Sequence, residues 1–197
     1  MNRVAVARSR NTPTPKQQHP QLTQKVDSAM RHTLILAAVL AACSTEKQAD
    51  NPSVQLGAAG FMLHLPPAMQ QALQAQAPGF RTVSTVSFRS DVSQAAAEAG
   101  GGLQPLFAVI KDLDGDGTTD AVVEGSTGDD APLQVVAILN RKTPVAMEVT
   151  RFATYDADAV GIYLMKPAAG SSAAFTVVNY PDATTTWSWH DGKFVAE

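Results

Sequence analysis

The chain has 197 residues, of which 45% are hydrophobic and 17% are charged. This is enough for one domain with a buried core and too little for two full ones, and no apolar stretch approaches the roughly 18 to 20 residues of a membrane-spanning helix. Six of the 15 basic residues but only one of the 18 acidic residues precede Cys43, so the body from Cys43 onward holds 9 basic and 17 acidic residues, a balance of −8. An acidic body argues against nucleic-acid binding and suits a cation or a basic protein partner.

The chain before Cys43 contains two segments of different character. Residues 1–29 are basic, rich in Gln and Pro, and lack the periodicity of a buried element. Residues 30–42 have the pattern of a secretory signal peptide, with a short positive start, a nine-residue apolar run and small residues at the end. We therefore expect translation to start at Met30, and residues 1–29 to be a mis-called extension that is disordered if it is made.

The end of this signal carries a lipidation pattern. The run Leu40-Ala41-Ala42-Cys43 resembles the lipobox of bacterial lipoproteins, and the resemblance implies that Cys43 is acylated, with palmitate among its chains, and becomes the first mature residue. Cys43 is the only cysteine, so an internal disulfide is excluded. Because Ser44 is not an aspartate, the same resemblance implies an outer-membrane anchor with the domain facing the periplasm. Several buried acyl chains, at about 0.8 kcal/mol per CH₂, make such anchoring permanent.

Two short helices are expected early in the mature chain. Residues 43–60 are polar and rich in Gly, Ser and Asn, which predicts a flexible tether to a single periplasmic domain over residues 61–197. The expected elements that follow are a strand over residues 61–65, a helix between Pro66-Pro67 and Pro78-Gly79, a strand over residues 81–88, and a short helix or loop over residues 90–102.

From Leu103 onward the pattern predicts a β-meander. Eight strands are expected, over residues 106–110, 121–125, 133–140, 145–152, 159–166, 174–180, 184–189 and 193–196. Turn residues separate them, and Asp191-Gly192 is a strong signal for a two-residue hairpin. Short connections without a crossover helix require antiparallel pairing. The predicted fold class is α+β, mainly an antiparallel β-sheet meander with one or two short N-terminal helices.

The connection between the first two of these strands is rich in aspartate. Carboxylates stand at loop positions 1, 3, 5 and 9, namely Asp112, Asp114, Asp116 and Asp120, and Thr118 at position 7 can offer its backbone carbonyl. Gly115 and Gly117 permit the sharp turns that wrap a chain round an ion. Hard oxygen donors on a flexible loop suit Ca²⁺ better than Mg²⁺, which keeps its waters, or Zn²⁺, which prefers nitrogen and sulfur.

The loop, KDLDGDGTTD, is not a complete EF-hand, because position 12 is Val123 where that loop needs glutamate. It resembles the D-x-D-G-D-G-x-x-D loops of integrin-type FG-GAP and VCBS repeats, which join two strands and bind calcium. The likeness covers Phe107–Glu124 and implies a metal loop; a propeller would need several copies, and one is present. Glu124 shares a strand face with Asp120 and is a candidate auxiliary ligand, directly or through water.

Three functional interpretations follow from these features. The favoured one is a non-catalytic, lipid-anchored periplasmic lipoprotein whose calcium-stabilised domain binds an unidentified protein partner. The second is an inhibitor or immunity lipoprotein against a cell-wall lytic enzyme, and the third, least favoured, is a calcium-dependent envelope hydrolase, for which no nucleophile and base stand at convincing spacing. The loop itself has two further interpretations: an ion that only staples the hairpin, and a solvated acidic turn without an ion.

Overall fold

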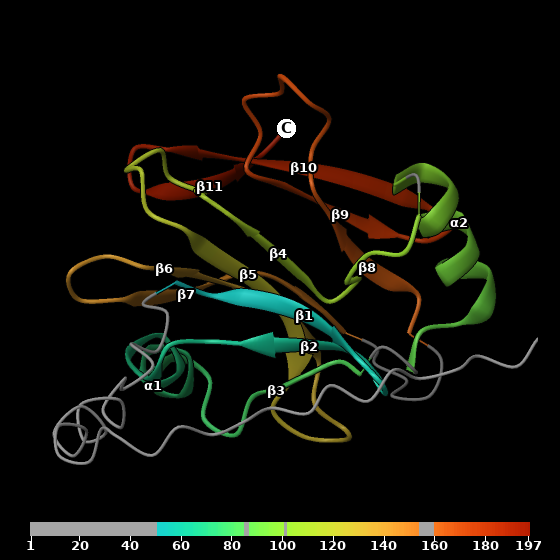
Figure 1. Cartoon of the computed structure of the whole chain (residues 1–197), viewed down its shortest axis with the longest axis horizontal. Coiled ribbons are helices and arrows are strands. Elements are labelled where there is room, and N and C mark those ends of the chain that lie inside the picture. The colour runs from blue at the N-terminus through green and yellow to red at the C-terminus, as the bar shows by residue number, and fades with distance from the viewer. Residues whose placement is uncertain (1–50, 85–86, 101, 154–159) are drawn as a thin grey trace, which may run out of the picture. The chain divides into compact units, whose positions relative to one another are not determined.

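The computed structural model describes residues 51–84, 87–100, 102–153 and 160–197. All of them belong to one compact unit, Thr45–Glu197, which is built mainly of antiparallel strands with two short helices in its described part (Figure 1). The predicted α+β class is therefore confirmed. The predicted signal peptide and Cys43 lie outside the described residues. No helix in the described ranges is long and apolar enough to cross a membrane.

A central antiparallel sheet organises the domain. Its strands are β3 (Arg81–Thr82), β4 (Ala108–Lys111), β5 (Asp120–Ser126), β6 (Leu133–Leu139) and β7 (Val145–Phe152). The order is β3-β5-β6-β7, and β4 pairs with the same edge of β5 as β3 does. Every residue of β5 and β6 is buried, which requires that both faces of the sheet are covered.

The C-terminal sheet covers one of these faces. Its strands, in spatial order, are β11 (Lys193–Ala196), β10 (Ala183–His190), β9 (Phe175–Asn179) and β8 (Ile162–Met165). The predicted Asp191-Gly192 hairpin is confirmed: both residues have positive φ, 50° and 82°, as a type I′ turn requires. The sheet packs through aromatic rings, with the fully buried Phe175 stacked on Trp187 and edge-on to Phe194.

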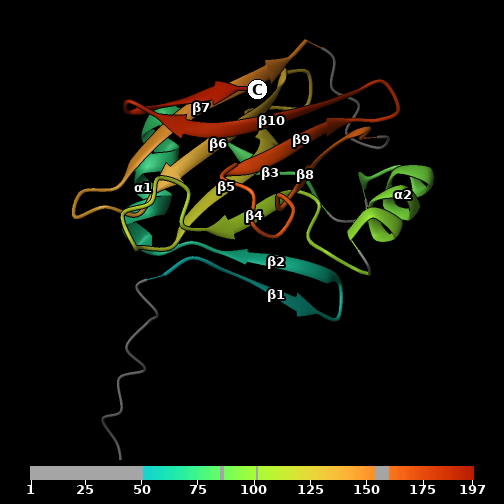
Figure 2. The same ribbon diagram turned by 90° about the horizontal axis from the view of Figure 1, so that it is seen from above.

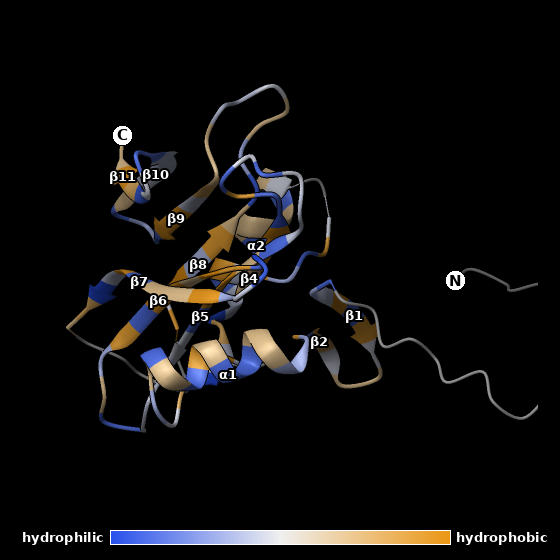
Figure 3. Ribbon diagram, turned by 90° about the vertical axis from the view of Figure 1, so that its left-hand side faces the viewer, coloured by the Kyte–Doolittle hydropathy of each residue, from blue (hydrophilic) through white to orange (hydrophobic). Residues whose placement is uncertain are grey.

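Helix α1 (Pro67–Gln76) covers the other face. It contacts β6 and β7 and buries Met69 and Leu73, which lie four residues apart on one side of the helix. Figure 3 shows the central sheet between α1 and the C-terminal sheet, with polar residues on the outer side of α1. A strand enclosed on both faces is mostly apolar, and this explains the runs AVV in β5 and VVAIL in β6.

The predicted tether over residues 43–60 is wrong from Ser53 onward. Strand β1 (Ser53–Gly57) pairs in antiparallel fashion with β2 (Gly60–His64), and β1 also contacts β4. Figure 2 shows this hairpin along one border of the domain. Val54 is partly buried against the core, whereas Gln55 and Leu56 are exposed, so this strand has a single apolar contact with the core within a polar stretch.

The strand predicted over residues 81–88 is largely wrong, because among the described residues only Arg81–Thr82 form a strand there, and Phe88 makes an isolated parallel bridge to Val160. The physical reason is competition for one edge of β5. The Glu124 amide donates to Phe107 at 2.9 Å, while the Glu124 carbonyl accepts from Val83 at 3.0 Å. Beyond Val83 the edge of β5 is therefore occupied by β4. Within residues 90–102, predicted as helix or loop, Ser90–Gly100 form helix α2.

Each of the eight strands predicted after Leu103 is confirmed, with ends that differ by up to three residues. They do not form one continuous meander, because the chain leaves the central sheet after β7 and begins the C-terminal sheet at β8. Residues 154–159 of this crossing lie outside the description.

Gly125 is expected to tolerate no side chain. A Cβ there would lie 2.1 Å from the Arg81 carbonyl oxygen and 2.7 Å from the Phe80 ring, so Gly125→Ala must push β3 away from β5. We expect a loss of about 2 kcal/mol in the free energy of unfolding, measured by urea denaturation of the purified protein. Gly128→Ala is the control, since its Cβ would meet only the Ala131 methyl at 4.0 Å. Equal losses for both variants would contradict this account of the β3–β5 contact.

Candidate metal centre

The Asp loop, residues 112–120, connects β4 to β5 across the register pair Lys111–Asp120. Gly115 and Gly117 have φ angles of 80° and 88°. A Cβ at either position would meet no atom within 4 Å, so glycine is needed for the left-handed backbone and not for space. These two turns fold the loop back on itself, as the glycine pattern predicts.

The fold brings three of the four predicted aspartates together. Asp112, Asp114 and Asp116 each offer a carboxylate oxygen, and these oxygens all lie within 4.8 Å of one another. Asp112 is oriented by two loop amides, because Gly115 donates to its Oδ1 at 2.7 Å and Gly117 to its Oδ2 at 2.9 Å. The loop backbone thus turns like charges toward one point, an arrangement that a cation stabilises.

Thr118 shapes the exposed side of this cluster. Its backbone amide donates to Asp116 Oδ1 at 2.8 Å. Its hydroxyl lies within reach of two acceptors, Asp116 Oδ1 at 2.5 Å and the Asn140 carbonyl at 3.0 Å. The side-chain hydrogen bond from Thr118, followed by the backbone one, holds the pKa of Asp116 below its ordinary value, so Asp116 stays ionised. That the Thr118 carbonyl is a metal ligand stays a prediction.

Asp120 lies behind the cluster rather than in it. Its side chain is fully buried, and its two oxygens accept from the amides of Leu113 at 2.8 Å and Asn140 at 2.7 Å. Burial raises the pKa of Asp120, the two backbone hydrogen bonds oppose that rise, and the charges of Asp114 and Asp116 add to it. Asp120 therefore links the start of the loop to the end of β6 through its two hydrogen bonds, and the negative charges of the loop favour its protonated form.

Arg141 is a member of the site that the sequence analysis missed. Its Nε and one terminal nitrogen donate to Asp114 Oδ2 at 3.0 and 2.6 Å, and the Asp114 side chain is only 1% exposed. The guanidinium also lies 5.4 Å from the centre of the Trp189 ring, within cation–π range. Arg141 lies there because β6 runs antiparallel to β5 and ends beside the loop that precedes β5; the predicted antiparallel order hinted at this position, but the pairing itself depends on the strand register.

Glu124 does not join the converging group. Gly125 faces Phe80, so alternation directs Glu124 to the opposite side of β5. The side chain is fully buried, and neither carboxylate oxygen has a hydrogen-bond partner among the described residues. Burial raises the pKa of Glu124 well above its ordinary value. The carboxyl group is thus a source of instability inside the sheet, and its predicted role as auxiliary ligand has no support from its position.

Comparison with protein-family models, with curated proteins and with solved structures found no match. The chemistry of the site is therefore inferred from its donor set. Three carboxylates without a nitrogen or sulfur donor among them form a hard oxygen site. Four negative charges, those of the cluster and Asp120, face one described cationic partner, Arg141.

The buried carboxyl of Glu124 predicts a specific dependence of stability on pH. Near pH 4 the carboxyl is mostly protonated in both the folded and the unfolded chain, so its ionisation adds little penalty there. As the pH rises, the Glu124 carboxyl loses its proton in the unfolded chain before it does so in the folded chain. Folding then requires the carboxyl to take up a proton again, which costs free energy. Wild type should therefore lose stability relative to Glu124→Gln between pH 4 and pH 7, by more than the roughly 0.5 kcal/mol typical of surface substitutions.

Urea titrations at several pH values measure this difference. Glu98→Gln is the matched control, because Glu98 is exposed on α2. If the stability curves of wild type and Glu124→Gln run parallel from pH 4 to pH 7, Glu124 is not held in its protonated form.

Proposed function

We propose that the protein is a lipid-anchored lipoprotein of the bacterial envelope, whose periplasmic domain binds a partner protein, is stabilised by one Ca²⁺ ion, and catalyses no reaction. The observation that carries the calcium proposal is the convergence of Asp112, Asp114 and Asp116 to within 4.8 Å. Like charges repel at this separation, and a divalent cation removes the repulsion.

The donor set favours calcium over other divalent ions. Ca²⁺ accepts six to eight oxygen ligands in flexible geometry, whereas Mg²⁺ demands an octahedron and Zn²⁺ prefers nitrogen or sulfur. Besides the three clustered carboxylates, the Thr118 carbonyl and Asp120 are the proposed ligands. Each Asp120 oxygen accepts one backbone hydrogen bond and retains a further lone pair, so metal binding does not require those bonds to break.

The lipobox-like run ending at Cys43 supports the anchor. Because β1 begins at Ser53, nine residues separate the lipidated cysteine from the first strand. Nine extended residues span roughly 30 Å at most. The proposed anchor therefore keeps the domain close to the membrane surface, where its partner must also be within reach.

Calcium binding should stabilise the fold. We expect calcium to raise the melting midpoint of the purified protein relative to EGTA, with about 2.7 kcal/mol of stabilisation at a hundredfold excess over Kd. Asp112→Asn should abolish most of this gain. In EGTA the same variant should be at least as stable as wild type, because it removes one of the repelling charges while an acceptor oxygen remains for the loop amides.

Asp129→Asn is the matched control for this melting experiment. Asp129 lies in an exposed turn outside the cluster, so the substitution should leave the calcium-induced shift unchanged. Identical midpoints in calcium and EGTA, together with no calorimetric heat on adding calcium, would leave the loop as a solvated acidic turn.

The lipid anchor is tested separately at Cys43. Cells that make the wild-type protein should incorporate radioactive palmitate into it and retain it in the membrane fraction. Cys43→Ser should abolish the label and either release the protein or leave an uncleaved precursor. If the wild-type protein is soluble and carries no label, the lipid anchor is wrong, and the calcium proposal is unaffected.

A further inference from the structure

The turn end of the β1–β2 hairpin, residues 56–62, is apolar throughout, and we call it the hairpin tip. Its sequence is LGAAGFM, which contains no charged side chain and no hydroxyl, amide or carboxyl group. The apolar runs of β5 and β6 are buried, but Leu56 is 65% exposed and Met62 is 57% exposed. The turn residues Ala58 and Ala59 are exposed as well. The tip is therefore more apolar than the core requires, and an exposed apolar segment of this kind marks an interaction site.

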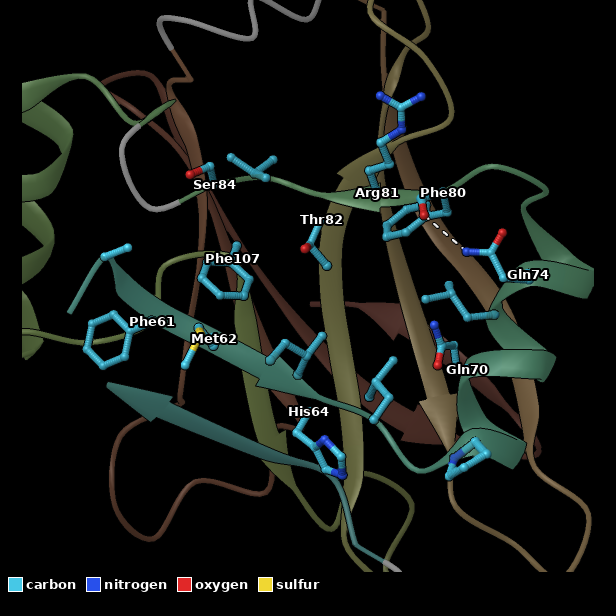
Figure 4. Close-up of a pocket in the computed structure, with 16 residues that line it drawn as sticks. Phe61, Met62, His64, Gln70, Gln74, Phe80, Arg81, Thr82, Ser84 and Phe107 are labelled. Atoms are coloured by element: carbon cyan, nitrogen blue, oxygen red, sulfur yellow. Dashed lines mark hydrogen bonds between the residues drawn. The ribbon is translucent and has the colours of Figure 1, made fainter. Parts of the chain in front are cut away.

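The tip is apolar on both of its faces. Leu56 pairs with Phe61, and Gln55 pairs with Met62. Because successive residues of a strand point to opposite faces, Leu56 and Met62 lie on opposite faces of the hairpin. Figure 4 shows Phe61 and Met62 at the start of β2, at the end of the strand that lies away from α1. One flat protein surface would cover only one face of the tip, whereas the acyl chains of a bilayer would surround both.

The polar residues next to the tip limit how deeply it can enter a bilayer. Gln55 and His64 are exposed, and Gln55 lies directly opposite Met62. From Gln55 to the turn at Ala58 the strand rises roughly 10 Å. The boundary between headgroups and acyl chains has a similar depth, roughly 5 to 10 Å. At this depth, water and headgroups still form hydrogen bonds with the backbone groups that the hairpin leaves unpaired.

The tip lies within reach of the proposed lipid anchor. The nine residues between Cys43 and Ser53 span roughly 30 Å at most, and β1 rises roughly 13 Å from Ser53 to Gly57. When the tip touches the membrane surface, Ser53 therefore lies about 13 Å from that surface, which is less than half of the span of the tether. The chain that leads from the anchor into the domain enters it at the hairpin that carries the tip, so the lipid surface is the apolar phase nearest to it.

We infer that the hairpin tip inserts into the lipid surface and forms a second contact of the domain with the membrane. This inference rests on the proposed lipid anchor and goes beyond it, because the second contact orients the domain with its β1–β2 hairpin toward the bilayer. A few apolar side chains would hold a free protein only weakly at a membrane. The tether makes insertion an intramolecular step, and for such a step a weak intrinsic affinity is sufficient.

The test uses the protein as cells make it, reconstituted into vesicles of phosphatidylethanolamine and phosphatidylglycerol. Leu56→Cys is labelled with an environment-sensitive fluorophore, and the unsubstituted chain, in which an acylated Cys43 has no free thiol, is the blank. Lipids that carry a nitroxide on the acyl chain should quench the label about twofold or more, because the tip reaches the acyl boundary. Val195→Cys is the matched control, since Val195 is an exposed apolar residue of β11, and its label should not be quenched.

A second measurement tests the apolar character of the tip. In chains labelled at Ala59→Cys, Met62→Asp should lower the quenching to the level of the Val195→Cys control, because a carboxylate is costly among acyl chains. Val145→Asp, the same change at another exposed apolar residue, should leave the quenching unchanged. Both variants should fold, because Met62 is 57% exposed and Val145 is 42% exposed. No loss of quenching in Met62→Asp, or an equal loss in Val145→Asp, overturns insertion of the tip.

The remaining outcomes separate this inference from the proposed function. A chain that carries palmitate but shows no quenching at Leu56→Cys, or equal quenching at Val195→Cys, retains the anchor and overturns the inference. Quenching at Leu56→Cys in a chain without palmitate overturns the anchor and keeps the tip as the membrane contact. A benzophenone on Leu56→Cys, activated in intact cells, should become attached to lipid. Attachment to a second copy of the chain or to another protein, without lipid, makes a protein the occupant and overturns the inference.

Discussion

The antiparallel pairing of β5 with β6 is the constraint on which the other features depend. Both strands are buried on both faces, so a shift by one residue would exchange the side chains that face α1 with those that face the C-terminal sheet. The register places Ala121 opposite Ile138, and this sets the end of β6 beside the Asp loop. Asn140 and Arg141 reach Asp120 and Asp114 for that reason alone.

Two buried carboxyl groups on β5 illustrate how position decides the effect of a charge. Asp120 and Glu124 are both fully buried, yet Asp120 accepts two backbone hydrogen bonds while neither oxygen of Glu124 has a described partner. An unsatisfied buried polar group costs about 1 to 3 kcal/mol, so Glu124 weakens the sheet where Asp120 strengthens its end. The difference arises because Asp120 lies at a strand terminus, where loop amides have no ladder partners.

The sequence predicts most strands and the shape of the Asp loop, because both depend on local chemistry. The alternation of apolar and polar residues predicted the exact ends of β7 and β11, and the glycines of the loop predicted its left-handed turns. It did not reveal the pairing of Arg141 with Asp114, which depends on strand register. Nor did the sequence pattern show whether the face of β5 that carries Glu124 is covered by another sheet. Strand β1 was missed because its alternation consists of only two apolar residues, Val54 and Leu56, within a polar stretch.

The Asp loop and the contact with β3 lie at opposite ends of the same strand. β5 begins at Asp120, opposite Lys111, and its last residues, Gly125 and Ser126, pair with β3. A cation bound at the proposed site would stabilise the native state as a whole, since a small domain unfolds cooperatively. It would thus protect the β3–β5 contact without any movement of β3, because separation of β3 from β5 by unfolding would become rarer by the same factor as unfolding of the domain.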